Sequence, residues 1–568
     1  MLNSIGRWLR RWSDGEEGKS AQTQLILSFV IGAVVGLVVV AFILLTGRLA
    51  ARMYPPGGAA WRRVLVPVLG ALTTGWLLAK YFPGARGSGI PQTKFAIFIH
   101  DGYISLKTVL GKFLCCSTSL ASGIALGREG PSVQIGAGIA SVLARRSGLQ
   151  GDDVKALIPV GCSAALAAAF NTPIAAVLFS LEEILGDLHA PVMGSVVISS
   201  ATSWMVLHMI LGDEPLFHVP AYQLVSPIEF LVYAVLGVVG GLASVAFVKL
   251  LLSLRIWFRG LPAKTVWLQP TVGGLLVGLL GWYMPEVLGV GYDYVERVLG
   301  GDMAVRTIAL LVVLKIVATA VCYSSGNAGG IFGPSLFIGA MVGGTVGSLA
   351  HALMPGVTAN PGAYALIGMG TAFAGIVRTP LTSVIMIFEM TRDYSIIVPL
   401  MISNLISFFV SYRLQRQPIY EALAHQEGVS LPGDEERVHQ ARLDVSDVLE
   451  QAETVAAEEL LDSRKMQQAD AAAAWPVMQG ERLVGLLREA MIRKVADGTT
   501  AGVAAERQFP FVHPDHPLSL ALEKMGDNNL NMLPVVSRAN VSQLLGVVRL
   551  PAILKAFGVS GALQGGPR

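Results

Sequence analysis

Charged side chains are scarce in this chain. Asp, Glu, Lys and Arg form 14% of the residues, hydrophobic residues form 53%, and the mean hydropathy is +0.58. A soluble globular protein carries about 25% charged residues, so this composition excludes that class. The formal net charge of +3 is too small to favour nucleic acid as a partner, and no nucleic-acid-binding module is recognisable.

Cysteine and the common catalytic signatures are also rare or missing. The four cysteines lie in apolar tracts without metal-ligand spacing, so we interpret them as small buried hydrophobic residues: Cys115, Cys116, Cys162 and Cys322. We expect no metal and no cofactor. No phosphate-binding loop is present to drive ATP-dependent transport, and no nucleophile–base pair or zinc-protease signature indicates an enzyme.

Long uncharged runs are abundant instead. Residues 20–47 are long enough to span a bilayer and too long for a signal peptide, and no small-residue cleavage site follows, so we expect a retained first helix. Residues 316–377 contain no charged residue but many glycines, which predicts short, broken helices that line a cavity. Further nearly uncharged runs cover 64–79, 107–126, 156–181, 191–212, 230–248, 265–285 and 394–412.

One motif inside these runs combines charge with helix-starting residues. Gly127-Arg-Glu-Gly-Pro131 ends the preceding helix and begins a new one at membrane depth. The N-terminus of a helix offers unpaired N–H groups and a positive dipole end, which together form an anion site. Glu129 could fill that site with its own carboxylate. Because a charged pair is costly in a bilayer, Arg128 and Glu129 mark an ion pathway.

The motif recurs in the second half of the membrane region. Residues 127–137 match residues 330–340 at seven of eleven positions, with an offset of 203. Residues 171–182 match residues 378–389 at an offset of 207, with Glu182 opposite Glu389 and Glu183 opposite Met390. Two matches in register predict two related halves, and paired Gly/Pro-interrupted segments point to the binding site of a transporter.

Four motifs in one order resemble those of a known family. They are Gly87-Ser-Gly-Ile-Pro91, Gly127-Arg-Glu-Gly-Pro131, Gly330-Ile-Phe-Gly-Pro334 and Gln417-Pro-Ile-Tyr420. Together they resemble the anion-site motifs of the CLC chloride channels and chloride/proton antiporters over residues 20–425. The resemblance implies an α-helical polytopic fold with two inverted halves and broken re-entrant helices. It also implies a homodimer with one anion pathway per subunit, in a bacterial-type inner membrane.

Beyond about residue 425 the charge density rises, and a two-fold Pro-strand, turn, Gly-strand pattern predicts a soluble α/β domain. This region resembles a tandem pair of CBS domains, which implies a cytoplasmic position. We therefore expect a cytoplasmic N-terminal segment at 1–22, a membrane domain at 23–425 with its halves divided near 215–228, a linker at 426–439, and CBS repeats at 440–500 and 501–568.

The resemblance also implies individual roles at the anion site. Ser88 and Tyr420 would donate hydroxyl hydrogen bonds to a chloride ion, and hydroxyls and helix N-termini suit a dehydrated halide because they do not trap it. Serine at position 88 favours chloride over nitrate or fluoride. Lys112 would give electrostatic support without direct ligation. The full expected chloride-binding set is Ser88, Gly89, Ile90, Arg128, Gly130, Ile331, Phe332, Gly333 and Tyr420.

One glutamate is expected to gate the pathway, and the pair Glu182-Glu183 decides between antiporter and channel. Glu129 would be the gate, because its carboxylate repels an entering anion and takes up a proton more readily when the anion arrives. Glu182 has a counterpart in the other half, so its role is structural, whereas Glu183 resembles the internal proton-transfer residue of antiporters. Gln92 and Lys94 replace acidic residues of some bacterial relatives. The sequence favours chloride/proton antiport by this arrangement.

The sequence leaves two alternative functions to weigh against antiport. The same scaffold could form a passive chloride channel, gated by voltage or pH. A divalent-cation transporter linked to CBS domains would need acidic clusters, which the membrane region lacks.

Nucleotide-binding members of the CBS family carry Ser or Thr at one position of each repeat and Asp at a later one. Here the Ser/Thr positions are Arg488 and Arg549, and the Asp positions are Met491 and Ala552. We therefore expect weak or absent adenine-nucleotide binding, with a role in dimerisation or in binding another ligand.

Overall fold

The computed structural model describes residues 16–188, 190–213, 215–217, 225–429, 431, 443–461, 474–492 and 498–557. The chain divides into two compact units, Met1–Leu431 and Pro432–Arg568. Most of the predicted linker at 426–439 and most of the predicted N-terminal segment lie outside the described residues, although helix α2 already begins at Glu16.

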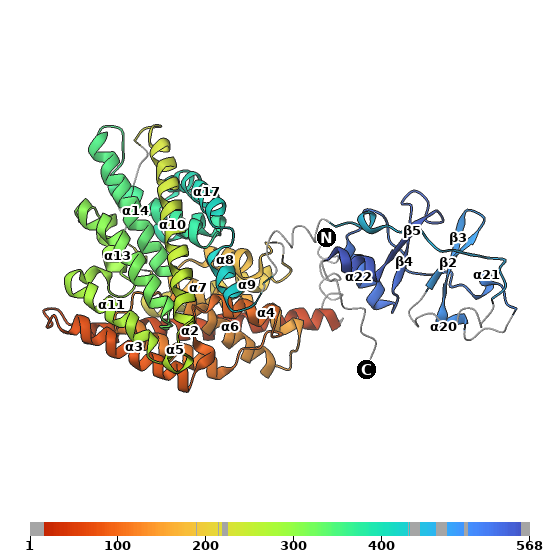
Figure 1. The fold of residues 1–568 in the computed structure, drawn as a ribbon, viewed down its shortest axis with the longest axis horizontal. Helices are drawn as coiled ribbons and strands as arrows, with labels where there is room; N and C mark the ends of the chain where they lie inside the picture. Colours follow the sequence, from red (N-terminus) through yellow and green to blue (C-terminus); the bar gives the residue numbers. More distant parts are fainter. Residues whose placement is uncertain are drawn as a thin grey trace, which may run out of the picture. The chain divides into compact units, whose positions relative to one another are not determined.

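The described residues of the first unit form helices joined by loops (Figure 1). Among the described residues, eight helical spans are long and apolar enough to cross a membrane. The helices of the first half are α2 (Glu16–Met53), α3 (Arg62–Lys80), α4 (Ile90–Phe98), α5 (Leu106–Ala121), α6 (Glu129–Arg146), α7 (Asp152–Phe170), α8 (Pro173–Phe179) and α9 (Met193–Leu211). The short η1 (Pro83–Ala85) precedes α4, and the π-helical η2 (Ser180–Leu185) extends α8.

The second half repeats this order of long and short helices. It contains α10 (Glu229–Arg259), α11 (Gln269–Tyr283), η4 (Pro285–Val287), α12 (Tyr292–Leu299), α13 (Val305–Ser324), α14 (Phe332–Leu353), α15 (Pro361–Ile376), α16 (Pro380–Thr391) and α17 (Ile397–Leu414), followed by α18 (Ile419–Gln426). The predicted division near 215–228 falls between α9 and α10, partly outside the described residues.

Helix breaks occur at equivalent places in the two halves. The sequence treats 156–181 as one uncharged run, but the structure divides it at Asn171, which adopts a left-handed conformation with φ +60°. Arg378 does the same in the second half with φ +69°. A proline follows two residues later in each half and cannot continue the preceding helix. The run 316–377 is likewise divided into parts of α13, α14 and α15, as the glycine content predicts.

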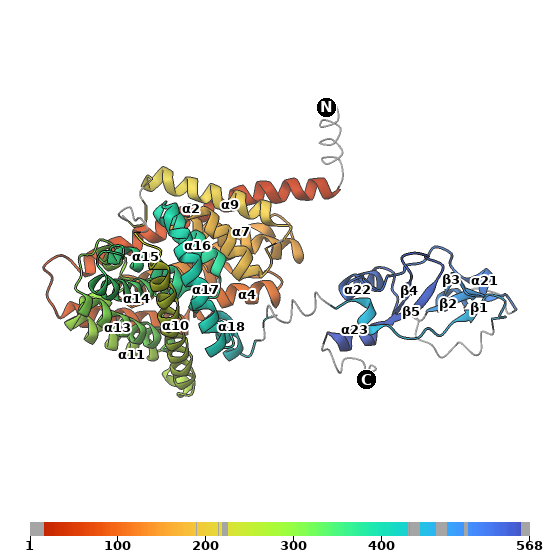
Figure 2. The same cartoon turned by 90° about the horizontal axis from the view of Figure 1, so that it is seen from above.

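Glycine permits the closest helix packing in each half. A Cβ atom on Gly136 of α6 would lie 2.2 Å from the carbonyl oxygen of Gly161 in α7. A Cβ atom on Gly339 of α14 would lie 2.3 Å from the carbonyl oxygen of Gly368 in α15, the neighbouring helix in Figure 2. The backbones of α6 and α14 are therefore held tightly against their neighbours, and this packing fixes where their N-termini point.

The second unit contains two antiparallel hairpins (Figure 1). Strands β2 (Ala474–Gln479) and β3 (Arg482–Arg488) pair beside β1 (Val455–Ala456), and α20 (Glu489–Ile492) follows. Strands β4 (Met532–Val536) and β5 (Leu544–Arg549) form the second hairpin, followed by α23 (Leu550–Ala556), with α22 (Leu518–Asp527) preceding it. The predicted strand, turn, strand and helix order is present in both repeats.

Candidate anion pathway

The Glu129 carboxylate lies where helices from the two halves meet. It is fully buried at the first residue of α6, and its Oε2 accepts a hydrogen bond of 3.2 Å from the backbone N–H of Gly333 in the first turn of α14. Its Oε1 accepts a hydrogen bond from the Tyr292 hydroxyl of α12 and lies 3.9 Å from Nε of Arg128. A negatively charged side chain thus occupies the N-terminus of a helix, where a free anion would bind.

Two hydroxyl groups predicted to bind the anion are buried without a hydrogen-bond partner. Ser88 and Tyr420 are 0% and 1% exposed, and neither hydroxyl oxygen meets hydrogen-bond geometry with a partner among the residues that the structure describes, although the Tyr323 phenol lies close to Ser88. Tyr420 lies within electrostatic reach of both Glu129 and Glu183. Because a buried polar group without a partner is costly, both hydroxyls call for an acceptor that an anion would supply.

The predicted backbone donors lie at the starts of three helices. Gly89 and Ile90 begin α4, Gly130 lies in the first turn of α6, and Ile331 and Phe332 begin α14. The first N–H groups of each helix have no backbone acceptor within that helix. The N–H of Gly89, however, donates to Oε1 of Gln92 at 2.9 Å. The structure therefore brings together every predicted backbone donor at helix starts from both halves.

These helix starts lie close together. A Cβ atom on Gly130 would lie 2.6 Å from the carbonyl oxygen of Ser88, and one on Gly89 would lie 2.3 Å from that of Gly130. The Phe332 ring packs against Phe170 and Phe373, with centroid distances of 4.8 Å and 4.3 Å. This aromatic packing buries the start of α14, where Phe332 is 1% exposed.

Two buried lysines hold the loops that precede α4 and α12. Lys112 Nζ donates to the carbonyl oxygens of Ala85 and Gly87, at 3.0 Å and 2.6 Å. Lys315 Nζ donates to the carbonyl oxygens of Val287 and Gly289, at 3.1 Å and 2.7 Å. Both side chains are 0% exposed. Lys112 therefore contacts the residue directly before Ser88, a position that agrees with support rather than ligation of an anion.

Glu183 forms a buried ion pair that the sequence did not predict. Its Oε1 lies 2.9 Å from Nζ of Lys94, and the two side chains are 8% and 10% exposed. The sequence alone marks Lys94 only as a position where some bacterial relatives carry an acidic residue. The pair joins α4, which carries the Ser88 loop, to η2.

Glu182 has a different role. Its carboxylate accepts the backbone N–H groups of Leu381 and Thr382 at the start of α16, at 3.3 Å and 2.8 Å. Glu389 of α16 accepts those of Ile174 and Ala175 at the start of α8, at 2.9 Å and 2.7 Å. Each half therefore caps a helix of the other, in agreement with the structural role predicted for Glu182.

Two cavities lined with arginine adjoin this group of residues. One of about 660 Å³ is bordered by Arg62, Arg63, Arg128 and Tyr292. Another of about 510 Å³ is bordered by Arg86, Arg255, Arg259 and Gly87, the residue before Ser88. Arg255 also pairs with Glu427 at 2.6 Å. Positively lined clefts concentrate anions, so both cavities suit the entry of a small anion.

Sequence reasoning missed Tyr292. The available signal was the segment Gly289-Val-Gly-Tyr292, which repeats the spacing of the two glycines in Gly87-Ser-Gly-Ile90 at an offset of 202. Two shared glycines are a weak signal, and the hydroxyl falls two positions later in the second copy.

Comparison with known proteins identifies the class. The family profile described as “Voltage gated chloride channel” matches residues 69–412, and a CBS-domain profile matches residues 503–558. The first match covers more than half of the chain, which therefore belongs to the CLC family of voltage-gated chloride channel proteins. It is a multi-pass membrane protein with the inverted-repeat fold of that family and a C-terminal α/β CBS region.

Curated relatives are described either as a chloride channel protein or as an exchange transporter. The chain is 34% identical to a putative chloride channel protein ClcB-like of Ralstonia nicotianae over 63% of this chain and 85% of that protein. It is 30% identical to the H(+)/Cl(-) exchange transporter ClcA of Vibrio parahaemolyticus over 72% of this chain and 91% of that protein. The named relatives are thus transport proteins.

Solved structures agree with this fold. A slow cyanobacterial Cl-/H+ antiporter superposes with a TM-score of 0.65 at 26% identity, covering 71% of this chain and 97% of that one. A eukaryotic CLC transporter superposes with a TM-score of 0.61 at 19% identity, covering 94% of this chain and 98% of that one. At that lower identity the second comparison shows the fold alone.

Proposed function

We propose that this protein exchanges chloride for protons across a membrane, with Glu129 as the gate. The observation that carries the proposal is the position of the Glu129 carboxylate, which accepts the N-terminal amide of Gly333 beside Arg128 and Tyr292, two residues that border an arginine-lined cavity. A relative at 30% identity bears the name of an H(+)/Cl(-) exchange transporter, and this supports exchange over passive conduction.

The gate works because a carboxylate and a chloride ion compete for the same donors. Ionised Glu129 takes the N–H of Gly333 and blocks the pathway. An arriving chloride repels the Glu129 carboxylate in this poorly screened site, and this repulsion favours protonation of the carboxylate. The neutral side chain then releases the N–H and O–H donors, which become available to the chloride. Each chloride that enters therefore promotes the uptake of a proton.

The chloride site would use hydroxyls and helix starts together. Ser88 and Tyr420 donate their hydroxyls, and the remaining donors come from Gly89, Ile90, Arg128, Gly130, Ile331, Phe332 and Gly333. Lys112 supports the site by holding the Ser88 loop. A binding site with dipoles and hydroxyls but no direct ammonium ligand binds the anion without trapping it.

Glu183 would pass protons between Glu129 and the solution on the Ser88 side. Its ion pair with Lys94 keeps a charged carboxylate near Tyr420, which lies within electrostatic reach of both glutamates. A passive channel would need no such residue. Whether chloride flux moves protons therefore distinguishes an antiporter from a channel.

The test is a paired measurement of chloride and proton flux in liposomes that contain the purified full-length protein. We expect a chloride gradient to drive protons uphill in the wild type. Glu129→Gln should abolish proton movement and leave chloride flux insensitive to acidity, and Glu183→Gln should abolish proton movement while chloride flux continues. Chloride flux that never moves protons in the wild type would instead identify a channel.

We further propose the arrangement typical of the family. The protein would act as a homodimer in a bacterial-type inner membrane, surrounded by lipid, with the N-terminal segment (1–22) and the C-terminal unit in the cytoplasm. The membrane domain would span 23–425 and the CBS repeats 440–500 and 501–568, joined by the linker at 426–439. No enzymatic step is needed for this function.

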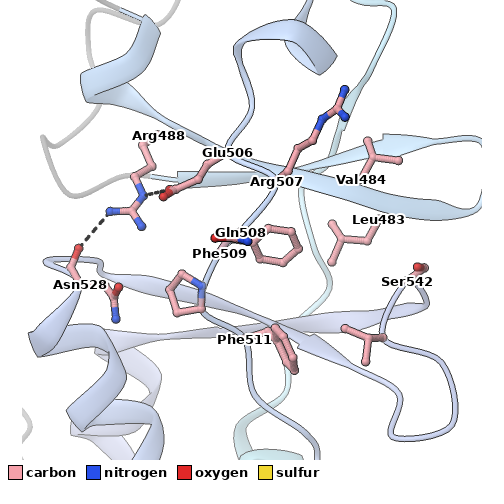
Figure 3. A pocket seen from close by; sticks show the side chains of 12 residues that line it. Leu483, Val484, Arg488, Glu506, Arg507, Gln508, Phe509, Phe511, Asn528 and Ser542 are labelled. Carbon is pink, nitrogen blue, oxygen red and sulfur yellow. Dashed lines mark hydrogen bonds and ion pairs between the residues drawn. The ribbon is translucent and has the colours of Figure 1, made fainter.

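In the CBS unit we propose weak or absent binding of adenine nucleotides. Figure 3 shows a pocket of about 600 Å³ in which Arg488 pairs with Glu506 at 2.9 Å and donates to the carbonyl oxygen of Asn528 at 3.3 Å. The arginine, at the position where nucleotide-binding members carry Ser or Thr, is thus already engaged, and Met491 stands where the ribose-binding carboxylate would be expected. Calorimetric titration of the full-length protein with ATP and AMP tests this, and binding at micromolar concentration would contradict it.

A further inference from the structure

The loop that carries Ser88 has a structural counterpart in the second half. Gly87 and Gly89 have φ values of +90° and +107°, and α4 follows directly. Gly289 and Gly291 have φ values of +62° and +88°, and α12 follows directly. Left-handed backbone at both glycines of both loops requires the same residue type, so the two loops are equivalent turns at the start of equivalent helices.

The two loops are also held in the same way. Lys112 and Lys315, which are 203 residues apart, donate to the carbonyl oxygens of Gly87 and Gly289 respectively. The equivalence therefore extends beyond the glycines to the buried cation that fixes each loop. Residue 88 is serine in the first loop, but residue 290 is valine in the second, so the second loop lacks a hydroxyl at that position.

Tyr292 supplies a hydroxyl two residues later in this second loop. Its phenol donates to Oε1 of Glu129. A Cβ atom on Gly333 would lie 3.0 Å from the Tyr292 hydroxyl and 3.0 Å from Oε2 of Glu129. The hydroxyl is therefore adjacent to the start of α14, beside the amide that holds the other carboxylate oxygen, and it borders the cavity lined by Arg62 and Arg63.

We propose that the Tyr292 hydroxyl is an anion ligand of the second half, the counterpart of Ser88. It holds the Glu129 carboxylate when the gate is closed and donates to the chloride ion that takes the place of the carboxylate when the gate opens. This inference rests on the proposed transport function. The cation of Arg128 lies 5.6 Å from the centre of the tyrosine ring and keeps the ring beside the site.

Chloride binding to the purified full-length protein tests the proposal. Glu129→Ala removes the competing carboxylate, so calorimetric titration with chloride reports the affinity of the open site. Adding Tyr292→Phe removes only the hydroxyl and retains the ring that faces Arg128. Because a hydrogen bond to a charged acceptor is stronger than a neutral one, we expect affinity to fall about tenfold.

A matched control uses a second tyrosine of α12. Tyr294→Phe in the Glu129→Ala background removes a phenol that faces Arg297, whose guanidinium lies 5.9 Å from the ring centre. Tyr294 is half-buried and borders the same cavity as Tyr292, but the Glu129 carboxylate accepts from Tyr292 and the Gly333 amide instead. We therefore expect chloride affinity within about twofold of Glu129→Ala alone. Elution as a single species on size exclusion establishes that each variant is folded.

The outcomes separate the inference from the function on which it rests. A selective loss in the Tyr292→Phe variant supports the proposal. Equal affinity with and without the Tyr292 hydroxyl, or an equal loss in the Tyr294→Phe control, overturns the role of Tyr292 and leaves chloride transport intact. A Glu129→Ala protein that binds no chloride overturns the proposed function itself, and the inference with it.

Discussion

Gly127 and Gly330 exchange two backbone hydrogen bonds, each 2.7 Å long, and form an isolated antiparallel bridge. The two residues occupy the same position in the two copies of the Gly-x-x-Gly-Pro motif. The bridge joins the halves directly before α6 and α14 begin, so it fixes the distance between Glu129 and the Gly333 amide.

Gly127→Ala should disturb the gate more than Gly330→Ala. A Cβ atom at Gly127 would lie 2.4 Å from Oε2 of Glu129, whereas the nearest atom to a Cβ at Gly330 is 3.1 Å away, on Pro131. The first clash displaces the carboxylate from its donor. In liposome flux measurements we expect Gly127→Ala to lose most of the acid dependence of chloride flux, and Gly330→Ala to retain more of it. A wild-type acid response in Gly127→Ala would contradict this.

Lys94 and Glu183 should depend on each other for stability. Removing one partner of a buried ion pair leaves an uncompensated charge, so Lys94→Met alone should destabilise the protein by about 3 kcal/mol. Glu183→Gln in the same chain should recover most of this loss. A double-mutant cycle of thermal unfolding in detergent measures the coupling. Additive effects of the two substitutions would show that the pair contributes nothing.

The exchanged helix caps should stabilise both halves, and the Glu182 carboxylate also accepts the Thr382 hydroxyl at 2.6 Å. Glu182→Ala and Glu389→Ala each leave two amide groups at a helix start without an acceptor. We expect each to lower the free energy of unfolding by about 1–2 kcal/mol, while the glutamine variants, which retain an acceptor oxygen, lose less. Thermal unfolding in detergent is the measurement, and alanine variants as stable as the wild type would refute the capping role.

The CBS unit should lose stability in mild acid. Burial and the neighbouring His513, Arg538 and Lys524 outweigh Asp515 and lower the pKa of His516. The unfolded chain then binds the proton more readily, so stability falls as pH drops below about 6.5, towards the folded-state pKa. Protonation at Nδ1 would also remove the acceptor of the His513 N–H.

Hydrogen exchange in the full-length protein checks this expectation. Protection of residues 512–536, corrected for intrinsic exchange, should fall between about pH 7 and about pH 5.5 in the wild type. His516→Gln keeps a hydrogen-bond acceptor but does not titrate, so its protection should fall less. Equal losses in the two proteins would assign the acid sensitivity to other groups.

The sequence predicted the parts of this fold that depend on local signals. The repeated motifs at Gly127 and Gly330 located the helix starts, and the matching segments at Asn171 and Arg378 marked the positions where helices break. Proline and glycine act through their own backbone, so their effects can be read without knowledge of distant residues.

Partners that come from elsewhere in the fold could not be predicted. Lys94 meets Glu183, and Tyr292 meets Glu129, across 89 and 163 residues of sequence. Neither distance corresponds to the repeat offset, so the internal symmetry gave no indication of these contacts. The carbonyl partners of the buried lysines likewise follow only from the folded loops.

The buried lysines have a consequence for how the chain is made. Inserting a lysine at the centre of a bilayer costs about 2.5–3.5 kcal/mol on insertion scales. Helix α5 carries the buried Lys112, and α13 carries the buried Lys315. In both halves the carbonyl groups that receive the lysine precede it in the chain, at residues 85 and 87 and at residues 287 and 289. They have already been synthesised when the lysine leaves the ribosome, so each half carries its own means of sheltering the charge during biogenesis.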